Sequence, residues 1–159
     1  MMIEQNPEFF MRKAIALSRE NVKQGGGPFA AIIVKDGKVI AEASNSVTRD
    51  NDPTAHAEIN AIRQACRELN TYDLSGCSIF TTCEPCPMCL GAIYWARLDR
   101  IYYGNNKTDA AEIGFDDAFI YQELNIPLNE RIISMVNLLP EEAGEAFRDW
   151  ELKEDKVTY

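Results

Sequence analysis

Three cysteines occupy every third position of one segment, Cys83, Cys86 and Cys89, in a chain with a single histidine, His56. A Cys-x-x-Cys pair can place two thiolates on one metal ion, and a histidine from a distant segment can supply a further ligand. Such a site forms only when the fold brings both segments together. The pattern therefore sets the first constraint on the fold.

Cys86 and Cys89 are expected at the start of a helix. Pro87 follows Cys86, and proline is favoured at the first helical position. There the helix dipole and the unpaired N–H groups favour a thiolate over a thiol. A catalytic zinc has three protein ligands and an open fourth position, whereas a structural zinc is closed by four. His56, Cys86 and Cys89 make three ligands, and a closed site with Cys83 as the fourth is the alternative.

Glu58 stands two residues after His56. On an ideal helix two side chains at this spacing diverge by about 200°, so we do not expect both to bind one ion. We interpret His56 as the ligand and Glu58 as a carboxylate beside the open position, where it can take a proton from a metal-bound water and pass it to a leaving group. This division favours a catalytic zinc. We interpret Cys83, and likewise Cys66 and Cys77, as small buried hydrophobic residues.

The rest of the chain alternates between helical and strand patterns. Asn6-Pro7-Glu8 is typical of a helix start, and Gly25-Gly-Gly27 of a helix end. Two β-prone runs around Asp36-Gly37 predict a hairpin of antiparallel strands. The next elements that we expect are a loop over 44–54, a helix over 55–69, a strand over 77–82, a helix over 87–97 and a strand over 100–103. This alternation implies a layered α/β domain with crossover connections.

The signals are weaker after Gly104. We expect helical fragments over 110–123, a strand or extended run over 132–136 and an acidic helix over 141–152. The chain shows no repeat, low-complexity tract or linker, and 159 residues are too few for two ordinary domains. We therefore predict a single domain over residues 1–159.

Charge and composition narrow the class of partner. The 16 basic and 25 acidic residues give a net charge of −9, which disfavours a polyanionic partner and favours small neutral molecules. The start of the chain has no signal-peptide pattern, and no window of about 18 apolar residues predicts a membrane span. The five cysteines, an odd number, fit reduced thiols better than a disulfide framework. We expect a soluble, cytoplasmic protein with no nucleic-acid or membrane partner.

The segment His56-Ala-Glu58, followed by Pro85-Cys86-Pro-Met-Cys89, resembles the H-x-E and P-C-x-x-C signature of the cytidine deaminase-like superfamily. The resemblance implies an α/β fold, a three-layer α/β/α sandwich with a central mixed five-stranded sheet. It also implies one catalytic Zn²⁺ per subunit, held by His56, Cys86 and Cys89. Glu58 is then the catalytic proton shuttle.

A resemblance over nearly the whole chain is to the small bacterial guanine deaminases. Segments 26–30, 51–58 and 83–97 are shared with deaminases of tRNA adenosine and of cytosine, whereas segment 108–121 is the discriminating one. The resemblance implies a zinc-dependent hydrolase of purine catabolism that converts guanine to xanthine and ammonia, through attack of zinc-bound hydroxide at C2. One alternative is a deaminase of guanosine, cytosine or a tRNA wobble adenosine. Another is a binding protein in which the zinc is structural and no substrate is converted.

A guanine substrate implies particular hydrogen-bonding groups in the pocket. Guanine presents N–H donors and a carbonyl acceptor, so its pocket needs a carboxylate and an amide. We expect Asp117 to accept from the purine, with Asp116 as the alternative; a helix cap is the competing interpretation of these acids. Asn45 can supply the amide, and Phe29 can pack on the flat ring.

Two further features follow from the resemblance. The expected helix starts offer backbone N–H groups near Ala57 and Cys86 that can hold an oxyanion. The C-terminal segment, about 140–159, is exchanged between subunits in that family, and Tyr159 matches the residue that caps the partner's site. The competing interpretation of the segment is a frayed tail. We expect a domain-swapped homodimer that binds a small nucleobase.

Overall fold

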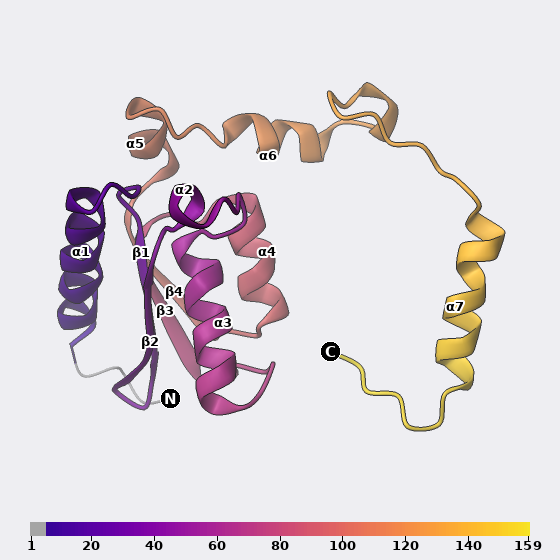
Figure 1. Cartoon of the computed structure of the whole chain (residues 1–159), viewed down its shortest axis with the longest axis horizontal. Coiled ribbons are helices and arrows are strands. Elements are labelled where there is room, and N and C mark those ends of the chain that lie inside the picture. The colour runs from indigo at the N-terminus through magenta and orange to yellow at the C-terminus, as the bar shows by residue number, and fades with distance from the viewer. Residues whose placement is uncertain (1–5) are drawn as a thin grey trace. The chain divides into compact units, whose positions relative to one another are not determined.

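The computed structural model describes residues 6–159. It contains two compact units, Met1–Ala118 and Phe119–Tyr159. Figure 1 labels the elements of the first unit, which are α1 (Pro7–Lys23), β1 (Ala30–Lys35), β2 (Lys38–Ser44), α2 (Val47–Asp50), α3 (Ala57–Leu69), β3 (Cys77–Cys83), α4 (Pro87–Trp95), β4 (Arg100–Asn105) and α5 (Lys107–Glu112).

The first helix begins where the sequence predicts. The Asn6 side chain accepts a hydrogen bond from the N–H of Phe9 over 3.1 Å, and Pro7 occupies the first turn of α1. A cap of this kind satisfies one of the N–H groups that a helix start leaves without a partner. The helix ends before the glycine-rich segment 25–27, as expected.

The hairpin is also confirmed. β1 and β2 pair antiparallel, and the turn between them is Asp36-Gly37. Both turn residues have positive φ, 50° and 72°. This is the left-handed backbone of a type I′ turn, for which an Asp-Gly pair is well suited.

The central sheet is mixed but has four strands, in the order β2-β1-β3-β4. β1 pairs antiparallel with β2 and β3, whereas β3 and β4 are parallel. The expectation of a five-stranded sheet is therefore wrong. The β-prone run over 132–136 forms no strand, and its Ile132, Ile133 and Val136 side chains are 80–81% exposed. β-branched side chains favour a strand only where a neighbouring strand offers hydrogen bonds and cover.

Helices cover both faces of the sheet (Figure 1). On one face α1 packs its Phe10 and Ala14 against Ile32, Val34 and Phe80. On the other face lies a larger apolar cluster to which α3 and α4 contribute, made of Ala31, Ile33, Ala41, Ala57, Ala61, Ala65, Leu74, Cys77, Ile79, Ile93 and Ala96. Successive strand residues point to opposite faces, so neighbours such as Ala31 and Ile32 belong to different clusters.

The second unit is helical. It comprises α6 (Ala118–Asn125), which begins at the boundary, a short 3₁₀ helix (Leu128–Glu130) and α7 (Pro140–Leu152). The helical fragments and the acidic C-terminal helix predicted from the sequence are thus present. Among residues 6–159, no helix combines the length and the apolar character needed to span a bilayer.

Candidate active site

Three strands begin or finish at the same end of the sheet, which we call the site edge. β3 and β4 are parallel and finish there, at Cys83 and Asn105, which are paired in register. β1 is antiparallel to β3, so the start of β1 at Ala30 lies at the same edge. Loops beyond the carboxyl ends of parallel strands are the usual place for a ligand site in α/β folds.

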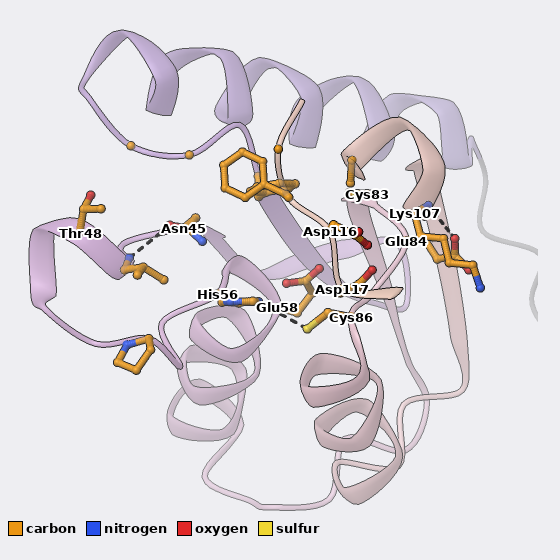
Figure 2. A pocket seen from close by; sticks show the side chains of 18 of the residues that line it. Asn45, Thr48, His56, Glu58, Cys83, Glu84, Cys86, Lys107, Asp116 and Asp117 are labelled. Atoms are coloured by element: carbon orange, nitrogen blue, oxygen red, sulfur yellow. Dashed lines mark hydrogen bonds between the residues drawn. The ribbon is translucent and has the colours of Figure 1, made fainter. Parts of the chain in front are cut away.

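Two helices begin beside this edge, and each has a predicted metal ligand as its N-cap. His56 precedes α3 and Cys86 precedes α4. The Nδ1 atom of His56 lies 3.6 Å from Sγ of Cys86 (Figure 2). It lies 3.5 Å from Sγ of Cys89. The structure therefore brings together the three ligands that the sequence predicts.

The three ligand atoms fit one zinc ion. They all lie within 4.8 Å of one another. Ligands about 2.0–2.3 Å from a tetrahedral zinc are separated from each other by roughly 3.5 Å, which matches the two distances from His56 Nδ1 to the sulfurs. Among residues 6–159 the group has three members, so a tetrahedral ion bound here keeps one position open for water or substrate.

The charges of the group suit a cation. Hydrogen bonds from Cys89 and His56 lower the pKa of the Cys86 thiol to about 4, against the opposing effect of burial. The bond to Cys86 also raises the pKa of His56. The pKa of Cys89 is raised by its hydrogen bond to Cys86, by burial and by the nearby Glu58. A bound cation supplies the positive charge that allows both sulfurs to ionise.

Cys83 stands apart from the metal group. Its side chain is buried, its Sγ lies 3.8 Å from the carbonyl oxygen of Asn106, and burial raises its pKa to about 11. Among residues 6–159, Cys83 does not belong to the set of side chains whose ligand atoms all lie within 4.8 Å of one another, so it is not placed as a fourth ligand. The interpretation of Cys83 as a small buried residue is confirmed, and the closed four-ligand site is not what the structure shows.

Glu58 lies beside the metal group, 6% exposed. Its Oε1 accepts a hydrogen bond from Thr81 Oγ1 over 2.8 Å, and its Oε2 accepts one from Cys89 Sγ over 3.3 Å. Burial raises the pKa of this carboxyl above its usual value, since the ionised form loses its hydration. A carboxyl with a raised pKa holds a proton more readily than a free one, which suits a group that takes and gives a proton in acid–base catalysis.

A cavity of about 620 Å³ is lined by Glu58 and by two of the three predicted metal ligands, His56 and Cys86. Its size is in the range of small-molecule sites. Phe29 and Phe115 form an aromatic wall, with ring centroids 4.9 Å apart and planes at 89°. The sequence indicated Phe29 and missed Phe115, although Phe115 belongs to the discriminating segment 108–121. The lining residues are Gly25, Gly26, Gly27, Phe29, Asn45, Val47, Thr48, Pro53, His56, Glu58, Cys83, Glu84, Cys86, Lys107, Ala110, Gly114, Phe115, Asp116 and Asp117.

Asn45 lies on the cavity wall opposite the acids. Its backbone N–H donates to the carbonyl oxygen of Phe29 over 3.0 Å, and its side-chain Oδ1 accepts from the N–H of Val47 over 3.2 Å. The side-chain oxygen of Asn45 is therefore already hydrogen-bonded to the backbone of Val47. The Nδ2 end remains as a donor for a carbonyl acceptor on a ligand.

The two neighbouring acids differ in their surroundings. Asp116 is exposed, and its Oδ1 accepts a hydrogen bond from the N–H of Ala118 over 2.8 Å, at the start of α6. Asp117 is half-buried, and its pKa is raised by burial and by the charges of Cys86, Asp116 and Glu84. Asp116 thus serves a local turn, while Asp117 faces the centre of the site (Figure 2).

The segment that carries these acids is anchored by Glu84, which directly precedes Pro85 and Cys86. Glu84 Oε2 accepts a hydrogen bond from the backbone N–H of Lys107 over 2.9 Å, at the start of α5. The backbone N–H of Glu84 in turn donates to the carbonyl oxygen of Asn105 over 2.7 Å. Glu84 thereby fixes the chain that leads toward Asp117.

Two predicted residues of the first unit, Cys89 and Ala57, are not among the residues that line the cavity. Ala57 is fully buried at the first position of α3, between the ligand His56 and Glu58, so only its backbone is placed near the site. Tyr159 belongs to the second unit, and its part in the site stays a prediction.

Comparison with known proteins identifies the family. Residues 4–105 match the model of the cytidine and deoxycytidylate deaminase zinc-binding region. The chain belongs to this family. The matched part contains the whole metal group and ends before the segment that carries the two acids.

Relatives within the zinc deaminase family differ in how much of the chain they match. The guanine deaminase of Bacillus subtilis is 52% identical over 155 residues, 97% of this chain and 99% of that protein. Its X-ray structure superposes with a TM-score of 0.95 at 51% identity, covering 98% and 99% of the two chains. The tRNA-specific adenosine deaminase of Aquifex aeolicus is 44% identical over 96 residues, 60% of this chain and 64% of that protein. The discriminating segment is therefore inside the first match.

A solved complex with 8-azaguanine is a further relative. It is 36% identical, with a TM-score of 0.69, and covers 73% of this chain and 68% of that one.

Proposed function

We propose that this protein is a guanine deaminase, which hydrolyses guanine to xanthine and ammonia. The observation that carries the proposal is the 52% identity to a guanine deaminase along nearly the whole chain, including the segment with Asp117. The metal-binding half alone is also shared with tRNA-specific adenosine deaminases, so it fixes the chemistry but not the substrate.

The His56, Cys86 and Cys89 side chains would hold the zinc. When bound there, zinc lowers the pKa of a water molecule and so supplies a nucleophile near neutral pH. Glu58 is positioned to take the proton of the attacking water, because its carboxylate lies against Cys89 and on the cavity wall. It then delivers this proton to a ring nitrogen of guanine. It takes the second proton from the added oxygen and passes it to the C2 amino group, which leaves as ammonia while the C2 carbonyl forms.

The cavity wall offers the groups that guanine needs. Asp117 would accept hydrogen bonds from the N–H donors of the base, and Asn45 Nδ2 would donate to its carbonyl oxygen. The aromatic wall of Phe29 and Phe115 would contact the flat base. Backbone N–H groups at the start of α3 and α4, near Ala57 and Cys86, would stabilise the negative charge that develops on attack.

We further propose the domain-swapped homodimer that the family implies, with segment 140–159 capping the partner's cavity. Phe147 and Leu152 of α7 are 78% and 81% exposed in the isolated chain, which favours a partner that covers them. We also keep the prediction of a cytoplasmic location. All five cysteines are unpaired, in keeping with a reducing compartment.

The substrate proposal is tested on the purified zinc-loaded protein with guanine, guanosine, adenine and cytosine as separate substrates. Ammonia release is followed, and Glu58→Gln, which keeps the shape of the side chain, serves as the blank. Guanine alone should react. Comparable kcat/KM for guanosine or cytosine would replace the assigned substrate while keeping the zinc chemistry.

A further inference from the structure

Asn21 ties two parts of the cavity wall together. It lies on α1, and its side chain is 2% exposed. Its Nδ2 donates to the carbonyl oxygen of Gly27 over 2.7 Å and to that of Asn45 over 2.9 Å. Gly27 ends the glycine-rich segment, and Asn45 follows β2, so one amide group joins two cavity segments that are distant in sequence.

The glycine-rich segment is shaped to admit this side chain. The backbone N–H of Gly26 donates to the carbonyl oxygen of Asn21 over 2.8 Å. A Cβ atom at position 26 would lie 2.4 Å from Asn21 Nδ2 and 2.8 Å from its Cγ and Oδ1, closer than nonbonded atoms approach. Glycine at position 26 is therefore needed for Asn21 to reach both carbonyls.

The hydrogen bond from Asn21 to the carbonyl oxygen of Asn45 helps to fix the whole Asn45 residue. Asn45 donates its backbone N–H to Phe29, and its side-chain Oδ1 is held by Val47, so the bond from Asn21 completes the restraint of this residue. A peptide held at its N–H, its C=O and its side chain has little rotational freedom left. Such preorganisation raises affinity because the ligand does not have to order the wall on binding.

The same loop is supported from the other side. Asn60 of α3 donates from Nδ2 to the carbonyl oxygen of Ser44 over 3.1 Å and to Oγ of Ser46 over 3.0 Å. These residues flank Asn45. Asn60 thus stabilises the loop, whereas Asn21 links the loop to the glycine-rich segment.

We propose that Asn21 is a positioning residue for the base pocket, which holds Asn45 and the glycine-rich segment at the separation that the substrate requires. The inference rests on the proposed function, in which Asn45 binds guanine. Asn21 lies behind the wall and touches neither the cavity nor the metal ligands. Its loss should therefore weaken binding of the base rather than the chemical step.

The two hydrogen bonds from Asn21 to the carbonyl oxygens of Gly27 and Asn45 form a clamp that can be broken in two ways. Asn21→Ala removes the donor, and Gly26→Ala leaves the donor but occupies the space that its side chain needs. Each should raise KM for guanine about tenfold, the order of one or two lost hydrogen bonds, with kcat and zinc content nearly unchanged. The double variant should also show about a tenfold rise rather than a hundredfold one, because both changes break the same contact.

The matched control is Ser18→Ala, one turn earlier on α1. Ser18 is buried too, and its Oγ donates to the carbonyl oxygen of Ile15 over 2.8 Å, away from the cavity. This variant should lower Tm without a change in KM. If it raises KM as much as Asn21→Ala does, the effect of Asn21 is general destabilisation and the proposal fails.

Amide hydrogen exchange of the zinc-loaded protein without any base separates this inference from the substrate assignment. Segments 24–30 and 44–48 should exchange faster in Gly26→Ala and Asn21→Ala than in the wild type. Unchanged exchange, or an additive double variant, overturns the clamp. If the wild type does not deaminate guanine, the proposed function is wrong, and the exchange rates still decide whether Asn21 holds the two segments.

Discussion

Thr81 Oγ1 donates a hydrogen bond to Glu58 Oε1 over 2.8 Å inside the fold, and the same hydroxyl lies 3.0 Å from the carbonyl oxygen of Cys83. A hydroxyl has one hydrogen to donate and can also accept. It can therefore donate to the carboxylate of Glu58, or donate to Cys83 while accepting from the protonated acid. One side chain thus orients the proton shuttle in both of its states.

Thr81→Val should lower kcat about tenfold with little change in KM, because Val keeps the shape of Thr but leaves Glu58 without this partner. Steady-state kinetics with guanine measure both constants. Thr82→Val is the matched control. Its Oγ1 accepts from the N–H of Ala30 over 3.1 Å, so its loss should reduce stability and not kcat. Equal kcat in Thr81→Val and the wild type would show that Glu58 needs no orienting partner.

In metal-free protein, Cys86 should be the first cysteine to be alkylated by iodoacetamide at pH 6. Because the pKa of Cys86 is about 4, its side chain is a thiolate at pH 6. Cys83, with a pKa of about 11, is a thiol at pH 6. The pKa values of Cys66, Cys77 and Cys89 are raised as well. Labelling of Cys86 should fall as the pH drops through about 4, and zinc should block it. Peptide mass spectrometry after labelling would contradict this if Cys66 or Cys89 reacted first.

Asp117→Asn should reduce kcat/KM for guanine by about 10- to 100-fold, the range for hydrogen bonds to a charged group. Asp116→Asn is a close control, since an asparagine oxygen can still accept from the N–H of Ala118. We expect less than about a threefold effect from it. The reverse order of the two variants would assign the substrate contact to Asp116.

The swapped dimer predicts complementation between two impaired variants. One chain carries Glu58→Gln and keeps Tyr159, and the other carries Tyr159→Ala and keeps Glu58. In a swapped heterodimer the intact Glu58 site is capped by the intact Tyr159 of the other chain, so about half of the wild-type activity should return. Co-purified, differently tagged chains provide the measurement. Activity no higher than that of the Tyr159→Ala homodimer would mean that each chain caps its own site or none.

The local features of the fold were predictable because short-range chemistry decides them. Asp36-Gly37 specified the hairpin, and Pro87 after Cys86 specified a helix start that presents a ligand. His56, Cys86 and Cys89 could be grouped because few residue types bind zinc and the chain has one histidine.

Features that depend on distant partners were not predictable in the same way. Trp95 has core-like spacing, yet it is 69% exposed while Ile93 on the same helix is 2% exposed. Apolar residues occur all round α4, so periodicity does not reveal which face is buried. The run over 132–136 has strand propensity but no strand beside it. The hydrogen bond between Asn21 and Asn45 joins residues 24 positions apart, and no local sequence pattern predicts it.

The most direct measurement is mass spectrometry of the product formed from guanine in water enriched with ¹⁸O. Hydrolytic deamination at C2 replaces the amino group with one oxygen from water, so the account predicts xanthine that contains one ¹⁸O atom, together with ammonia. The Glu58→Gln variant should yield neither above background. Unchanged guanine after incubation with zinc-loaded wild type, or a labelled product from another base instead, would contradict the central claim.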